Sequence, residues 1–132
     1  MSKTYVKNYT NTFNIRGSEI SVSAPARFDC ETDRIVADTA LDDQALALAR
    51  AQYRKRYKVV TPQEIKALRQ KWHLTQREFA KVVGWSPSTV ALYETGELPT
   101  TGNNRLLKIL IKDEQVMREF IADSQAADLL EN

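Results

Sequence analysis

The sequence predicts an α+β protein, in which a small N-terminal β-hairpin/helix module precedes an all-α domain of five helices. Residues 5–28 are rich in Tyr, Val, Ile, Thr and Phe with polar alternation, which is typical of half-buried strands. From residue 42 onward, apolar side chains recur at helical spacing, and Ser/Thr caps and glycines divide the segments. We expect the first module to span residues 1–58 and the helical domain to span residues 59–132.

The first module begins with two strands, YVKNYTNTFNI and SEISVSAPARF. The residues RGS between them form a turn signal, in which Gly17 can take a positive φ. A third short strand is expected over residues 34–37. The pattern then predicts one helix over residues 42–57. Asp42 or Asp43 would begin this helix, because negative charge suits a helix N-terminus, and the cations RKR would lie near its other end.

Three N-terminal caps begin the helices of the second part. Thr61 with Glu64, and Thr75 with Glu78, have the spacing of capping boxes. Ser86 precedes a proline, which favours a third helix start. Apolar stripes predict a fourth helix in TTGNNRLLKILIKD and a fifth in DEQVMREFIADS, and the last residues, QAADLLEN, are expected to be loose.

The composition is that of a globular protein without a membrane span. Hydrophobic residues make up 42% and charged residues 27% of the chain, and apolar runs such as LLKILI are only a few residues long. The N-terminal stretch MSKTYVKNYTNTF has no apolar signal region. We therefore expect a cytoplasmic location.

The residue types argue against metal binding and catalysis. The chain has one cysteine, Cys30, and one histidine, His73, whereas a structural zinc site normally takes four such ligands. There is no Ser/His/Asp set and no glycine-rich nucleotide loop. We expect no metal, no cofactor, no catalytic residue and no enzyme activity.

The charge is distributed unevenly along the chain. The net charge of +2 divides into −2 for residues 1–49, +9 for residues 50–112 and −5 for residues 113–132. A basic middle favours a polyanionic partner, and a solvated helical surface accounts for it equally well. The run YRKRYK at residues 53–58 has the same two interpretations: a linker that contacts DNA, or the charged end of a helix.

The helices expected over residues 75–83 and 86–95 are arranged as a helix-turn-helix pair. A short glycine-containing turn joins them, and the second helix begins with small hydroxyl residues. Such a start lets the backbone approach DNA closely and leaves N–H groups for phosphate. In a pair of this kind the first helix crosses the DNA backbone and the second lies in the major groove.

The segment IKALRQKWHLTQREFAKVVGWSPSTVALYETGELPT closely resembles the Cro/CI-type (XRE) helix-turn-helix family. The resemblance spans about residues 61–111 and rests on L-T-Q-x-x-x-A, then G-x-S-x-x-T-V-x-x-Y-E-x-G, then x-x-P. It implies a sequence-specific DNA-binding repressor with an XRE-type fold. Two-fold symmetry of a homodimer would require an inverted-repeat operator in double-stranded DNA.

The same resemblance implies a role for individual residues. Those that would face the base edges are Ser86, Ser88, Thr89 and Leu92. Those that would hold the DNA backbone are Gln76, Arg77, Lys81, Asn103, Asn104 and Arg105. Leu92 departs from the family, because a base-reading polar side chain usually stands there and a leucine can touch only a thymine methyl. Glu94 is structural in the family, and Trp85 in the turn is expected to pack beneath the second helix.

The order of segments in the whole chain resembles the MqsA/YgiT-type antitoxins. Those proteins place a small zinc-bound β domain before an XRE-type domain; the first binds a ribonuclease toxin, and the second dimerises and represses the operon. This chain departs from the zinc site, because only Cys30 remains and CETD stands where C-x-x-C would be. Zinc binding is therefore expected to be lost.

These observations lead to one function hypothesis and its alternatives. The first is a DNA-binding repressor that is the autoregulating antitoxin of a type II toxin–antitoxin operon, with a toxin protein as a possible partner. One alternative is a phage or stand-alone prokaryotic transcriptional regulator whose N-terminal module binds a small ligand or a protein. Another is a module that mainly neutralises a toxin enzyme, with DNA binding secondary.

Overall fold

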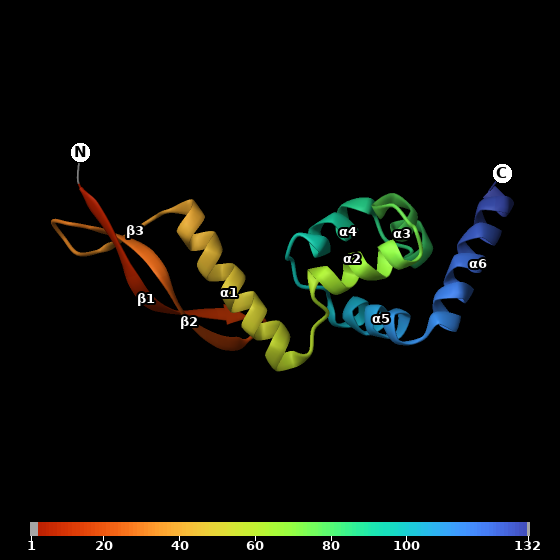
Figure 1. The fold of residues 1–132 in the computed structure, drawn as a ribbon, viewed down its shortest axis with the longest axis horizontal. Coiled ribbons are helices and arrows are strands. Elements are labelled where there is room, and N and C mark those ends of the chain that lie inside the picture. Colours follow the sequence, from red (N-terminus) through yellow and green to blue (C-terminus); the bar gives the residue numbers. More distant parts are fainter. Residues whose placement is uncertain (1–2, 132) are drawn as a thin grey trace. The chain divides into compact units, whose positions relative to one another are not determined.

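The computed structural model describes residues 3–131, and the side chains of residues 3–126. The chain divides into two compact units, Met1–Lys58 and Val59–Asn132. The first unit contains β1 (Thr4–Ile15), β2 (Ser18–Asp29), β3 (Ile35–Val36) and α1 (Thr39–Tyr57). The second contains α2 (Pro62–Lys71), α3 (Gln76–Val83), α4 (Pro87–Glu94), α5 (Thr101–Lys112) and α6 (Glu114–Glu131) (Figure 1). The mixed α+β class predicted from the sequence is confirmed.

The sheet of the first unit is a long hairpin with one short added strand. β1 and β2 pair antiparallel along their whole length, from Ile15↔Ser18 at the turn to Thr4↔Asp29 at the far end. The turn residues Arg16 and Gly17 have φ values of 52° and 85°, and positive φ at both positions characterises the type I′ turn of two-residue hairpins. β3 pairs antiparallel with β2, so the third strand predicted from the sequence is present but covers only Ile35–Val36.

One face of β2 forms the core of the first unit. Alternate side chains are buried, and these are Ile20, Val22, Ala24, Ala26 and Phe28. α1 packs over β2 and runs back along it, as Figure 1 shows. β1 is the edge strand, and most of its residues stay exposed, because the helix covers β2 rather than the edge.

The predicted start of α1 at Asp42 is wrong. The helix begins three residues earlier, at Thr39, and Asp38 is its N-cap, with Oδ1 accepting a hydrogen bond of 3.0 Å from the N–H of Leu41. Arg27 on β2 donates from Nε to the second oxygen of Asp38 at 2.8 Å. A contact with the sheet therefore positions the cap, and the helical spacing of apolar residues gives no information about this contact. Asp42 supports the start instead, since its Oδ2 accepts from the N–H of Asp38 at 3.1 Å.

The caps predicted for the second unit are confirmed. Thr61 with Glu64, and Thr75 with Glu78, form complete capping boxes, and the Ser86 side chain caps α4. The core of this unit consists of Val60, Ile65, Leu68, Phe79, Ala80, Val90, Tyr93, Leu107, Leu110 and Met117. Every helix from α2 to α6 contributes to it, so α3 and α4 are held on a shared apolar base.

The expected loose end at QAADLLEN is wrong for the backbone that the structure describes. α6 continues to Glu131. Oδ1 of Asp113 accepts from the N–H of Gln115 in its first turn, and Met117, Val116 and Phe120 pack its first half against the core. Over the described residues, no helix is both long enough and apolar enough to cross a membrane.

Replacing Asp38 by Ala is expected to weaken the start of α1 by about 1 kcal/mol, since an unsatisfied N-terminal N–H group replaces a capped one. Amide hydrogen exchange of Leu41, followed by NMR, measures this locally. Asp43→Ala is the matched control, because it removes a carboxylate of the same helix turn that is exposed. Equal loss of Leu41 protection in the two variants would contradict the assignment of Asp38 as the cap.

Candidate nucleic-acid interface

The turn between α3 and α4 is fixed by a glycine and a tryptophan. Gly84 ends α3 with φ of 81°, a left-handed conformation that most side chains resist. The Trp85 ring packs edge-on against Phe79 of α3 and Tyr93 of α4, with centroid distances of 6.2 and 5.5 Å. The expectation that Trp85 packs beneath the second helix is confirmed. The ring therefore sets the position of α4 relative to α3.

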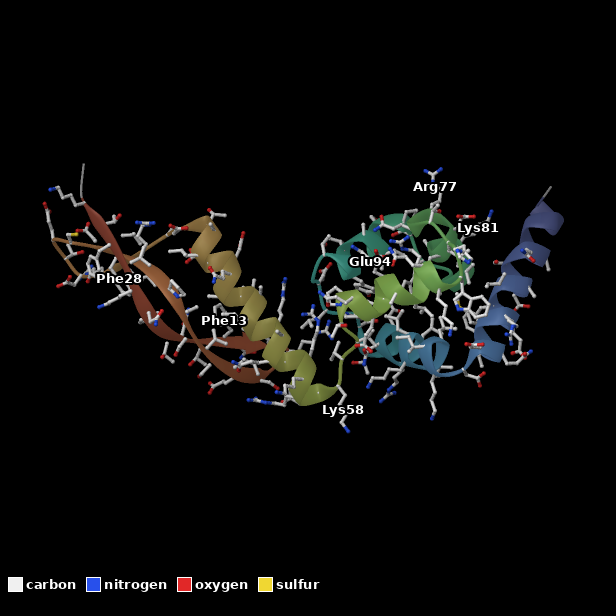
Figure 2. All side chains as sticks on the ribbon, in the orientation of Figure 1. Phe13, Phe28, Lys58, Arg77, Lys81 and Glu94 are labelled. Atoms are coloured by element: carbon white, nitrogen blue, oxygen red, sulfur yellow. The ribbon has the colours of Figure 1, made fainter. Side chains whose placement is uncertain are left out.

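A buried ion pair attaches α4 to α2. Arg69 donates from Nε and Nη2 to the two carboxylate oxygens of Glu94, each at 2.9 Å. The Glu94 side chain is only 1% exposed and that of Arg69 15% exposed. Figure 2 labels Glu94 on α4. Arg69 also donates from Nη1 to the carbonyl of Leu74, at the turn that leads into α3. One guanidinium thus joins three consecutive helices, and Glu94 has a structural role.

The environment of Glu94 lowers the pKa of its carboxyl. Burial acts to raise this pKa, and hydrogen bonds from Arg69 and Gln76, together with the Arg69 charge, outweigh it. The pKa of the Arg69 guanidinium is raised by the same pair, chiefly through its hydrogen bond to Glu94. Both groups therefore stay charged at neutral pH.

The N-terminus of α4 carries a cluster of hydroxyl groups. Ser86 Oγ accepts from the N–H of Thr89 at 3.2 Å, and it lies 3.0 Å from Ser88 Oγ and 2.9 Å from Thr89 Oγ1. Ser86 and Ser88 are exposed, and Thr89 is half-buried. Leu92 lies three and four residues after Thr89 and Ser88, on the same helix face, and is 51% exposed. The structure brings the four predicted base-facing residues onto one accessible surface.

The exposed side of α3 presents two cations. Arg77 and Lys81 are four residues apart, so they share a helix face, and Figure 2 shows both projecting outward from α3. Gln76 differs from them, because it is half-buried and its Nε2 donates to Glu94 at 3.4 Å. The bracing role expected of Gln76 therefore has a structural basis.

The three predicted backbone contacts on α5 are not equivalent. Asn103 donates from Nδ2 to the Tyr93 hydroxyl at 2.9 Å, which ties α5 to α4. Asn104 Oδ1 accepts from the N–H of Val60 at 2.8 Å, which ties α5 to the entry of the unit. Both amides hold the domain together, and only Arg105 of the three is exposed.

Sequence reasoning did not identify the pairing of Arg69 with Glu94. Glu94 belongs to the Y-E-x-G motif, but Arg69 lies 25 positions earlier, and no local spacing links the two residues. Their charge could have indicated the pairing. Each residue lies next to an apolar core position, Leu68 or Tyr93, where an unpaired buried charge would destabilise the fold.

The zinc site implied by the antitoxin resemblance does not fit the residues present. Cys30 is exposed, and the described part of the chain contains no group of three or more His, Cys, Asp or Glu side chains able to hold a metal ion.

A comparison with known protein families agrees with the arrangement of α3 and α4 as a helix-turn-helix. Residues 65–110 match the family model described as Helix-turn-helix, and the matched range runs from α2 into α5. No match was found among curated proteins. The matched domain supports a DNA-binding transcriptional regulator, and it lies wholly within the second unit.

Replacing Glu94 by Leu is expected to lower the free energy of unfolding of the second unit by about 3–5 kcal/mol, because the Arg69 charge is left buried and unpaired. Urea unfolding followed by tryptophan fluorescence reports on this unit alone, since Trp72 and Trp85 both lie in it. The double variant Arg69→Met/Glu94→Leu should recover more than half of the loss. A double variant no more stable than Glu94→Leu would contradict an ion-pair role.

Stability of the second unit is expected to fall in acid. A carboxyl whose folded pKa is lowered contributes stability that is fully present above its unfolded pKa, about 4.3 for glutamate, and that is lost as pH falls through the folded value. The urea midpoint should therefore stay level from pH 7 to about 5 and decline below that. Glu94→Gln should show a shallower decline, and a decline parallel to the wild type would count against Glu94 as its source.

Proposed function

We propose that the protein is a sequence-specific transcriptional repressor that binds an inverted-repeat operator as a homodimer. The observation that carries the proposal is the surface of α4, where Ser86, Ser88, Thr89 and Leu92 lie together at the start of a braced helix. α3 packs directly against α4 and adds the outward cations Arg77 and Lys81. Hydroxyls and an apolar tip suit base edges, and cations suit phosphates.

The chemistry of this surface favours a particular mode of reading DNA. Serine and threonine hydroxyls donate to or accept from several bases, and Leu92 can contact a thymine methyl. None of the four side chains can make the two parallel hydrogen bonds by which arginine reads guanine. We propose that much of the specificity comes from DNA shape and deformability. The role is non-enzymatic and cytoplasmic.

We further propose that the setting is a type II toxin–antitoxin operon, which the protein autoregulates. The order of a small β module before the helix-turn-helix unit supports this. The first unit also offers a surface for a protein partner, because Tyr9 and Ile35 are 41% and 49% exposed and line the same cavity. The toxin would be a small ribonuclease encoded beside this gene.

A ligand-binding first unit is the second candidate, and a specific cavity favours it. The cavity has a volume of about 260 Å³ and lies between the sheet and the first half of α1. Tyr9 and Phe13 of β1, Val22 of β2, and Leu41 and Asp42 of α1 are among the residues that line it. Its lining is mostly apolar with one carboxylate, which suits a small amphipathic ligand or an apolar side chain of a partner.

DNA binding is tested by gel shift with the region upstream of the protein's own gene. A palindromic fragment should bind at least a thousandfold more tightly than a scrambled one at physiological salt. Equal affinity for the two fragments would overturn specific repression.

Two substitutions separate base reading from backbone contact. Thr89→Ala should change the sequence preference, because Thr89 faces the groove. Arg77→Ala should weaken binding to all sequences alike and reduce the salt slope by about 1, since it removes one phosphate contact. Affinities for a panel of operator variants measure both effects. Unchanged preference in Thr89→Ala would remove α4 from the reading role.

The antitoxin proposal is tested separately, by co-expression with the neighbouring small reading frame. A stable complex on size exclusion, and relief of growth arrest, are expected if that frame encodes the toxin. Tyr9→Asp should abolish the complex while leaving the preference for the operator intact, since the proposed base-facing residues all lie in the second unit. A neighbour that neither arrests growth nor binds would contradict the antitoxin role.

A further inference from the structure

The first unit is electrically polarised along its length. α1 runs antiparallel to β2, so the loop before α1 lies at one end of the unit and the end of α1 lies at the other. The end around the β2–β3 loop gathers the acidic residues Asp29, Glu31, Asp33, Asp38, Asp42 and Asp43. The opposite end gathers the cations Arg16, Arg50, Arg54, Lys55, Arg56 and Lys58, which we name the basic end.

Two contacts bring the hairpin turn to the end of α1. Ser18 Oγ lies 2.6 Å from the Tyr57 hydroxyl, and Arg56 donates from Nη1 to the carbonyl of Glu19 at 3.4 Å. Arg16 precedes this pair of β2 residues in the turn and is exposed. The basic end is thus assembled from two elements about 40 residues apart in sequence, as the 39-residue separation of Ser18 and Tyr57 shows.

Part of the positive charge of the basic end has no carboxylate partner among the described residues, although Glu19 adds one carboxylate to this end. Among the residues that the structure describes, Arg50, Lys55 and Lys58 make no ion pair. Burial lowers the pKa of Arg54, and the charge of Arg50 lowers it further, so these like charges are close enough to repel. Figure 2 shows Lys58 projecting outward from the end of α1. A bound polyanion would relieve this repulsion.

The helix dipole accounts for only part of the arrangement. Cations are favoured in the last turn of a helix, and Arg54, Lys55 and Arg56 occupy that turn of α1. The dipole does not account for Arg50, one turn earlier, or for Arg16 in a hairpin turn. Cations from separate elements that converge on one end indicate a surface for an extended anion.

We propose that the basic end binds the phosphate backbone of duplex DNA without sequence preference. The proposal rests on the proposed function, because the helix-turn-helix unit begins directly after the basic end. The N–H of Val60 is held by Asn104, and Lys58 lies two residues before it, within about 7 Å along the chain. The DNA held by the second unit is therefore the polyanion most available to the basic end. The basic end adds affinity and salt dependence, and α4 is the element proposed to read the operator sequence.

The test measures the salt dependence of binding with a charge-matched control. The variant Arg16→Asn/Lys55→Gln removes one cation from each element, and Asn at position 16 keeps the positive φ that the type I′ turn requires. The control Lys3→Gln/Arg34→Gln removes the same charge from exposed positions at the acidic end of the same unit. Fluorescence anisotropy with a labelled palindromic operator duplex and its scrambled counterpart, from 50 to 300 mM salt, yields the slope of log Kobs against log salt.

The double variant is expected to reduce the magnitude of this slope by about 2 on both duplexes, since each phosphate contact contributes about 0.9. The ratio of operator to scrambled affinity should stay that of the wild type, and the control variant should keep the wild-type slope. A double variant with the wild-type slope on a duplex that still binds would overturn this proposal and leave the repressor proposal standing. Equal loss in the control would assign the effect to net charge and overturn it as well. If neither duplex bound the wild-type protein, both proposals would fail together.

Discussion

The pair of Arg69 and Glu94 is the constraint on which the geometry of the second unit depends. A charged pair this deeply buried is stable only when both partners are present and well aligned, and here two parallel hydrogen bonds supply the alignment. The same guanidinium holds the Leu74 carbonyl, so α2, the start of α3 and the end of α4 are connected through one side chain. The exposed residues of α4 therefore project from a rigid base, as a reading surface requires.

Around this pair, polar side chains mainly form hydrogen bonds within the domain. Gln76 reaches Glu94, and Asn103 reaches the Tyr93 hydroxyl, so two residues of types that commonly contact DNA are engaged in supporting α4. The outward surface is then left to small hydroxyls, Leu92 and the cations of α3. This division separates the groups that position the helix from the exposed groups to which we assign DNA contact, and the proposed sequence preference then depends on very few atoms.

Local signals could be predicted from the sequence, and non-local ones could not. The capping boxes at Thr61 and Thr75 involve residues three apart, so composition and spacing reveal them. The true cap of α1 depends on Arg27, 11 residues earlier on another element, and the pattern pointed to Asp42 instead. The exposure of β1 has the same origin, since only the packing of α1 over β2 decides which strand is covered.

The weak discrimination between bases by the α4 side chains and the basic end of the first unit both bear on where the binding free energy comes from. A well-placed two-bond contact to a base is worth about 1–3 kcal/mol of discrimination, and the side chains of α4 make none. Affinity must then come largely from phosphates, each of which adds attraction without adding discrimination. In the complex that we propose, cations of the first unit supply such attraction. In the proposed repressor, the first unit strengthens the complex, while α4 and the two-fold symmetry of the proposed homodimer decide where it forms.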